Sequence, residues 1–186
     1  WKVYGTGIRS QPTGAIFSNY SIGEFKECEI LGFGQDYGFS KDPNTLIKCS
    51  IDKSKKKIYL YECYYETGLS TSQLYDLNSK YAGRHLIVGD SAEPRLIKEL
   101  FDRKLNIVAC TKGQGSVTAG ISLMLEYDII IDPSSKNLIK EFNNYSWIDK
   151  TNKSVPIDLW NHGIDASRYF ISKILENPHR GKYYIK

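Results

Sequence analysis

The sequence predicts an α/β domain with one mixed β-sheet and helices on both of its faces. Three observations support this fold class. Three strand-like segments follow one another with only short turns between them, helical patterns then alternate with short apolar strands, and a last helical pattern lies near the C-terminus. The 186 residues are enough for one domain with a substantial core and few for two.

The first three strands are expected to form an antiparallel unit. The predicted strands are Glu29–Asp36, Thr45–Ile51 and Ile58–Tyr65, and the turns between them are Asp42–Asn44 and the charged segment Asp52–Lys57. Strands joined by such short turns pair as antiparallel neighbours.

From residue 70 onward, helices alternate with strands. Each helix has an apolar stripe at helical spacing, and Ser70 or Thr71, Pro94 and Ser134 supply start signals. The predicted elements are a helix to about Lys80, strand Arg84–Asp90, a helix from Glu93, strand Asn106–Cys110, helix Val117–Tyr127, strand Asp128–Ile131, a helix from Ser134 through Phe142, and a helix from Asn161 to about Leu175. Such alternation favours parallel crossovers. Antiparallel strands followed by parallel ones, with helices on both faces, form the RNase H-like architecture.

Residues 1–24 contrast with the rest of the chain. They are rich in Gly, Ser and Thr and have weak periodicity. We expect them to form an irregular N-terminal arm or linker that leads in from a preceding domain. Residues 25–186 are then expected to form the RNase H-like domain.

Composition narrows the class of protein. Apolar residues make up 41% of the chain and charged residues 25%, which is ordinary for a folded domain and excludes disorder. No segment approaches the roughly 20 apolar residues of a membrane helix, so no membrane partner is expected. The net charge of +4 permits a nucleic-acid partner without arguing for one. The four cysteines are widely spaced, which predicts reduced, buried thiols in a cytosol-like compartment.

Acidic residues stand where two predicted strands end. Asp36 and Asp90 each follow a Gly-containing, otherwise apolar segment, and ligand sites in open α/β sheets lie beyond the strand ends. Asp165 lies within the last predicted helix, and His162 precedes it by one turn. Taken singly, a strand-end aspartate is more often a turn former, and a histidine in a first helical turn is more often a cap or core residue.

Taken together, these residues indicate a metal site. Clustered carboxylates repel one another unless a cation joins them. Oxygen ligands favour Mg²⁺ or Mn²⁺ over zinc, and we expect two ions in the catalytic state, where they can activate a water and stabilise the leaving oxygen of a phosphodiester. His162 is either an additional ligand or a partner that orients Asp165.

Basic residues in three places are candidates for DNA contact. The four lysines of the predicted 52–57 turn could meet phosphates, or they could be a solvated turn that protects an edge strand. Lys112 lies in a Gly-rich loop after a strand and is the best single candidate for a phosphate contact, and Arg95 adds to a local excess of positive charge. The candidates are Lys53, Lys55, Lys56, Lys57, Arg95 and Lys112. Binding through phosphates is expected to tolerate any sequence.

Five segments of the sequence resemble the nuclease domain of the large terminases of tailed phages. They occur in the order typical of that family and span about residues 28–175. The segments are Gly34–Phe39 followed by Asp42-Pro43, Gly89–Pro94, Lys112–Ser116 followed by Gly120-Ile121, Leu138–Trp147, and Asn161–Tyr169.

The resemblance implies an activity and a setting. Asp36, Asp90 and Asp165 match the metal-binding carboxylates of the family, and His162 matches the histidine of its last motif. The implied activity is divalent-metal endonuclease cleavage of double-stranded DNA concatemers during viral genome packaging, in the cytoplasm of the infected bacterial host. The implied partners are the small terminase subunit, the portal protein and the ATPase motor domain of the same full-length protein. Residues 1–24 would lead in from that motor domain. No GxxxxGK[ST] motif is present in the chain.

Three other functions use the same features. A Holliday-junction resolvase or transposase core would place the same carboxylates on the same fold. A Gly-x-Asp-x-Gly strand turn also opens the ATP sites of actin-like proteins and sugar kinases, although no second phosphate loop is evident. A non-catalytic docking module is disfavoured, because it has no reason to hold like charges together.

Overall fold

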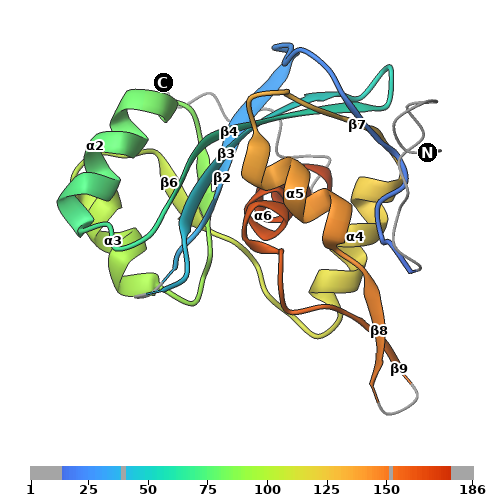
Figure 1. The fold of residues 1–186 in the computed structure, drawn as a ribbon. Coiled ribbons are helices and arrows are strands. Elements are labelled where there is room, and N and C mark those ends of the chain that lie inside the picture. The colour runs from blue at the N-terminus through green and yellow to red at the C-terminus, as the bar shows by residue number, and fades with distance from the viewer. Residues whose placement is uncertain (1–13, 39–40, 151–152, 177–186) are drawn as a thin grey trace.

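The computed structural model describes residues 14–38, 41–150 and 153–176. These residues form one seven-stranded sheet and a separate two-stranded hairpin (Figure 1). The strands of the large sheet are, in spatial order, β1 (Tyr20–Ile22), β7 (Asp128–Ile131), β4 (Lys57–Glu66), β3 (Asn44–Asp52), β2 (Ile30–Asp36), β5 (Ile87–Gly89) and β6 (Ile107–Ala109). In this sheet β3 alone runs antiparallel to its neighbours, so the carboxyl ends of the other described strands share one edge.

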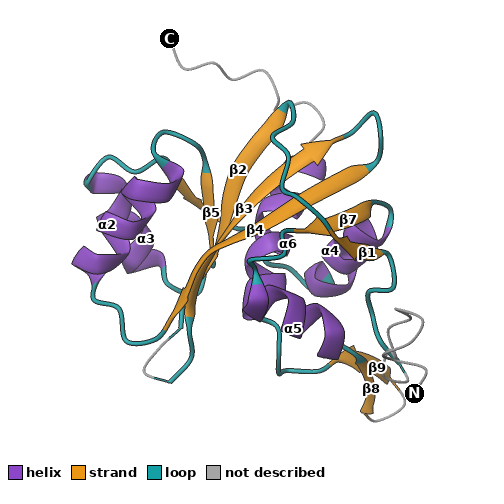
Figure 2. Cartoon of the chain, turned by 45° about the horizontal axis from the view of Figure 1, so that its top comes forward, coloured by secondary structure: helices purple, strands orange, loops and turns teal. Residues whose placement is uncertain are grey.

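Helices cover both faces of the sheet, which confirms the predicted fold class (Figure 2). One face carries α2 (Thr71–Ala82) and α3 (Pro94–Asp102), and the other carries α4 (Ser116–Leu125), α5 (Lys136–Asn144) and α6 (His162–Leu175). The hairpin of β8 (Trp147–Lys150) and β9 (Lys153–Pro156) lies beyond the end of α5.

Local signals explain most helix starts. Ser70 caps α2 in a reciprocal capping box with Gln73, and Pro94 is the first residue of α3. The predicted cap of α5 is wrong by one residue. Ser135 stands at the cap position, whereas the Ser134 hydroxyl donates to Asp132 within the turn after β7. The strands β5 and β6 are shorter than predicted, because only three residues of each pair with a neighbour.

One stretch of the predicted N-terminal arm forms a strand of the sheet. Residues Tyr20–Ile22 form β1, which pairs in parallel with β7 at the edge of the sheet. The Phe17 side chain is fully buried and packs against the tilted ring of Phe142, with 4.9 Å between the ring centres. The prediction of an irregular arm is wrong for these three residues, because they pair with the open edge of β7. Residues 1–13 lie outside the described part.

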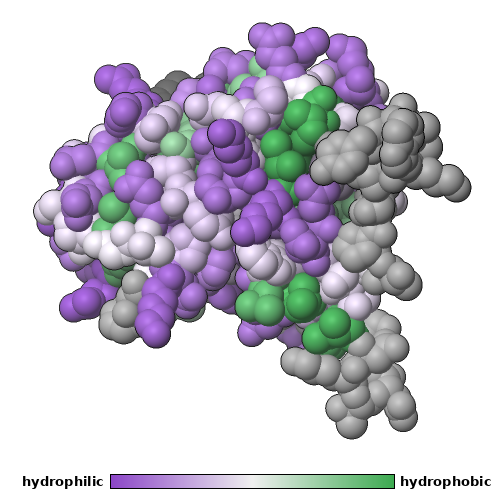
Figure 3. All heavy atoms as spheres, viewed as in Figure 1, coloured by the Kyte–Doolittle hydropathy of each residue, from purple (hydrophilic) through white to green (hydrophobic). Residues whose placement is uncertain are grey.

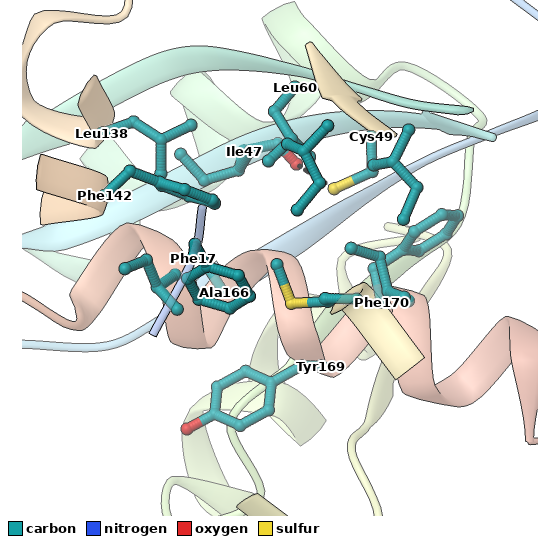
Figure 4. Close-up of a cluster of buried hydrophobic side chains, with 14 of the residues drawn as sticks. Phe17, Ile47, Cys49, Leu60, Leu138, Phe142, Ala166, Tyr169 and Phe170 are labelled. Carbon is teal, nitrogen blue, oxygen red and sulfur yellow. Dashed lines mark hydrogen bonds between the residues drawn. The ribbon is translucent and has the colours of Figure 1, made fainter. Parts of the chain in front are cut away.

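The core has two layers, one on each side of the sheet. The larger cluster lies between the strands and the three helices α4, α5 and α6. Figure 4 shows Ala166 and Phe170 of α6 facing Ile47 and Cys49 of β3, with Tyr169 pointing away from the sheet. The smaller cluster fills the space under α2 and α3.

The cysteines and the surface agree in large part with expectation. All four cysteines are free, and three are buried, but Cys28 is partly exposed, so the prediction of uniformly buried thiols is wrong there.

The face seen in Figure 3 is covered mainly by hydrophilic residues, with smaller hydrophobic areas. Within the described ranges, none of the helices has the length and apolar character needed to span a bilayer.

Candidate active site

Asp36 and Asp90 stand side by side at the carboxyl edge of the sheet. The strands β2 and β5 are parallel neighbours, with Gln35 paired to Gly89, so the next residue on each strand is an aspartate. The Asp90 amide donates to the carbonyl of Gln35 at 3.0 Å, which continues the pairing to this point. Neighbouring strands lie about 4.8 Å apart, so the backbones of the two aspartates are close.

Asp165 joins them because α6 packs directly onto β2. A Cβ atom at Gly34 would lie only 1.8 Å from the carbonyl oxygen of Ala166, and one at Gly32 would lie 2.2 Å from the Phe170 ring. The two glycines therefore let the helix approach the strand more closely than any larger residue would allow. Asp165, next to Ala166, is held over the end of β2.

The charges of the three carboxylates act on one another. Burial raises the pKa of Asp36 above its usual range, and the negative charges of Asp165 and Asp90 add to that shift. Burial also raises the pKa of Asp165, with a further contribution from Asp90 and against the opposing charge of Arg168. The structure thus brings together the three acids that the sequence singles out.

Each carboxylate is paired with its own basic side chain. Asp36 Oδ2 lies 3.0 Å from His162 Nδ1, and this hydrogen bond raises the pKa of His162. Asp90 forms an ion pair with Lys112. Asp165 accepts two hydrogen bonds from Arg168, at 2.9 and 3.2 Å. His162 is therefore a partner of Asp36 here, whereas the sequence suggested Asp165.

These pairings determine what the site offers a cation. Among the described residues, no group of three or more His, Cys, Asp or Glu side chains stands gathered around one metal position. The donor set itself suits a hard divalent cation, because three carboxylates and an imidazole line one partly buried edge of the sheet, within range of one another's charge. A shared ion would compete most directly with the Lys112 ammonium group for Asp90.

Two residues of the site were not assigned a role from the sequence. Arg168 is 5% exposed and pairs with Asp165 one helical turn away, a spacing that could have revealed it. The Tyr169 hydroxyl donates to Asp90 Oδ2 at 3.2 Å, and Lys112 Nζ lies 5.4 Å from the centre of the Tyr169 ring. No sequence pattern predicts that contact, because Tyr169 and Asp90 are 79 positions apart.

The candidate DNA-contacting residues separate into two places. Lys112 lies at the acidic edge, and Arg95 is exposed in the first turn of α3, shortly after Asp90. The turn that contains Lys53, Lys55, Lys56 and Lys57 joins β3 to β4 at the opposite end of the sheet. Asp36 and Ile30 are six residues apart on β2, and Ile30 pairs next to that turn, so roughly 20 Å of strand separates it from the acids.

Two of these lysines have partners of their own. Lys55 lies 3.3 Å from Asp52, and Lys56 lies 3.6 Å from Glu126 and above the ring of Tyr127. These contacts fit the interpretation of the turn as a solvated surface feature. The structure does not bring the turn to the acids.

Known proteins resemble this chain over most of its length. The family model described as the terminase RNase H-like domain matches residues 36–173. The large terminase subunit of Bacillus phage SPP1 is 33% identical over 169 residues, which covers 82% of this chain and 40% of that protein. The chain therefore spans less than half the length of that relative.

Solved structures agree with the sequence comparison. The SPP1 large terminase nuclease domain with bound Mn has 31% sequence identity and a TM-score of 0.73, covering 84% of this chain and 97% of that one. The large terminase nuclease of the thermophilic phage G20c, with bound magnesium, has 17% identity and a TM-score of 0.65, covering 87% and 98%, and this likeness concerns the fold alone. These matches confirm the RNase H-like architecture and the resemblance found in the sequence. The chain belongs to the terminase RNase H-like domain family.

Proposed function

We propose that this chain is a divalent-metal-dependent endonuclease that cleaves double-stranded DNA concatemers during viral genome packaging. The observation that carries the proposal is the meeting of Asp36, Asp90 and Asp165 at the carboxyl edge of the sheet, from three segments far apart in the sequence. A related nuclease domain with 31% identity was solved with bound Mn, which supports a divalent metal here.

The three aspartates would hold the metal, with His162 as an additional ligand or as the partner that orients Asp36. When bound, two Mg²⁺ or Mn²⁺ ions would activate a water and stabilise the leaving oxygen of the phosphodiester. Arg168 is buried beside Asp165 and fixes the orientation of that carboxylate. Tyr169 does the same for Asp90 through its hydroxyl.

Lys112 would contact both Asp90 and the DNA substrate in turn. Its ammonium group pairs with Asp90, and 42% of the side chain is exposed, so it has room to swing away when a metal ion takes its place on the carboxylate. Once released, it is available to a DNA phosphate beside the acids. Arg95 would contact the duplex from the same edge, whereas the lysines of the β3–β4 turn would require DNA that extends across the sheet.

An open edge suits a polymeric substrate. The hollow beside Tyr169 and Arg168 encloses only about 20 Å³, which is far too little to surround a DNA duplex. DNA would therefore lie across the surface, bound by phosphate contacts that tolerate any sequence.

The setting is proposed for the whole protein. In the full-length chain an ATPase motor domain would precede the nuclease domain, and the small terminase subunit and the portal protein would be partners in the host cytoplasm. We place the start of the nuclease domain before Phe17 rather than at residue 25, because Phe17 and β1 belong to its core and sheet.

Cleavage assays with matched variants test the proposal. Asp36→Asn, Asp90→Asn and Asp165→Asn should each abolish cleavage of linear duplex DNA in Mn²⁺ or Mg²⁺. Asp132→Asn is the control, because Asp132 also ends a strand but binds Ser134 and the Phe25 amide instead. Wild-type activity in a variant that combines all three aspartate substitutions would refute the proposal.

The same assay separates the other candidate functions. Preference for a four-way junction over linear duplex would indicate a resolvase. Stabilisation by ATP without cleavage would indicate a nucleotide-binding domain.

A further inference from the structure

Glu141 of α5 is a buried carboxylate that contacts the first turn of α6. The residue is 1% exposed. Its Oε2 atom accepts hydrogen bonds from the amides of Gly163 at 2.8 Å and Ile164 at 3.0 Å. Its Oε1 atom accepts a third from the hydroxyl of Tyr65 on β4, at 2.8 Å.

These contacts supply a cap that α6 does not provide for itself. The first amides of a helix have no partners within the helix, and a side chain at the cap position usually accepts from them. Asn161 stands at that position in α6 but makes no side-chain capping hydrogen bond. Glu141 does this from another helix, through its Oε2 atom.

The capped turn lies between two residues of the proposed active site. Gly163 and Ile164 separate His162 from Asp165 in the sequence. A Cβ atom at Gly163 would lie 2.8 Å from Leu138 and 3.1 Å from Glu141, so the glycine lets α5 come this close. Tyr65 adds a second link, because its ring meets the ring of His162 edge-on at 6.4 Å.

We propose that Glu141 is a positioning residue for the active site: by capping α6 across the interface between α5 and α6, it fixes where His162 and Asp165 stand relative to Asp36. The three hydrogen bonds support the capping of α6, and the effect on the active site rests on the proposed function. Glu141 is not placed as a metal ligand, because its oxygens are already bound to the helix and to Tyr65.

Two substitutions of similar size isolate the acceptor. Glu141→Gln keeps a carbonyl oxygen for the two amides, and its NH₂ group can donate to the Tyr65 oxygen. Glu141→Met fills the same space without an acceptor. The readout is Mn²⁺ affinity by titration calorimetry on the 186-residue chain. We expect Glu141→Gln to stay within about threefold of wild type and Glu141→Met to lose about tenfold or more, as is typical for groups that orient metal ligands.

A control separates positioning from stability. Leu100→Ala removes a fully buried side chain from the cluster under α3, on the other face of the sheet, and should leave Mn²⁺ affinity unchanged. All proteins are compared at a temperature at which each is folded. If Glu141→Met does not fold, Glu141→Asp gives the same comparison, because its shorter side chain draws the carboxylate back from the amides.

Hydrogen exchange tests the cap without any metal. The amides of Gly163 and Ile164 should exchange at least about tenfold faster in Glu141→Met than in wild type and remain protected in Glu141→Gln. Wild-type Mn²⁺ affinity in Glu141→Met would overturn the positioning role, and unchanged exchange would overturn the cap. If the wild-type chain binds no Mn²⁺, the proposed function fails, and the exchange result still decides the cap.

Discussion

Replacing Gly34 by alanine tests how closely α6 must approach β2 for the site to exist. The new Cβ atom would lie 1.8 Å from the carbonyl oxygen of Ala166 and 2.5 Å from its carbonyl carbon, whereas ordinary contact begins at about 3.4 Å. Both neighbours are backbone atoms that no side-chain rotation can remove. The helix must therefore move away from the strand by more than an ångström.

The cost of that shift can be bounded. Overpacking a core costs about 1–3 kcal/mol when side chains can adjust, so a backbone clash should reduce the free energy of unfolding by about 3 kcal/mol or more. Activity should fall further, because a displacement of about 1 Å at a catalytic group can reduce the rate about 100-fold. Asp165 moves with the helix, whereas Asp36 stays with the strand.

Urea denaturation followed by circular dichroism measures the first effect, and nicking of plasmid DNA in Mn²⁺ measures the second. Gly113→Ala is the matched control, because a Cβ atom there meets nothing within 4 Å, and its stability should change by less than about 0.5 kcal/mol. If Gly34→Ala were as stable and as active as wild type, the close approach of α6 would not matter for the site, and the reasoning would be refuted.

Three further substitutions have defined outcomes. Phe17→Ala removes a fully buried ring and should reduce the free energy of unfolding by about 3–5 kcal/mol in urea denaturation; a change below about 1 kcal/mol would contradict its place in the core. Lys112→Met should raise Mn²⁺ affinity in calorimetry, because it removes the cation that pairs with Asp90, and weaker binding would contradict that competition. Burial raises the pKa of Glu141 from 4.5 to about 7, although the Tyr65 hydroxyl and His162, which face the carboxylate, act to lower it. Folding therefore favours the protonated form of Glu141. The stability that this protonation contributes is present below about pH 4.5 and is lost as the pH rises through about 7. Between pH 5 and pH 8, the free energy of unfolding of Glu141→Gln should therefore rise by up to about 3 kcal/mol relative to that of wild type, measured by denaturation at a series of pH values. Parallel pH profiles of the two proteins would contradict this prediction.

The sequence predicted elements well where the signal is local. The capping box at Ser70, the proline of α3 and the apolar run of β7 each act within a few residues, and each element formed where expected. It failed at β1, whose three residues carry little strand pattern of their own. That strand forms because β7 offers an unpaired edge, and pairing with a distant segment overrides local propensity.

The candidate site divides in the same way. Asp36 and Asp90 could be named because each follows a strand, and parallel strands in one sheet bring their carboxyl ends to a common edge. The turn of lysines before β4 was an equally visible pattern, yet the direction of β3 carries it to the far end of the sheet. A charge pattern does not encode where in the fold it will lie.

Local patterns in the sequence account for most of the helices and strands, and for which acids lie near an edge of the sheet. The groups that those acids contact follow from how the helices and strands pack together. His162, which contacts Asp36, and Tyr169, which contacts Asp90, lie 126 and 79 positions away in the chain, and the cap of α6 comes from α5. Such contacts depend on how closely two packed elements approach, and that distance is set by the whole core rather than by any neighbouring residue.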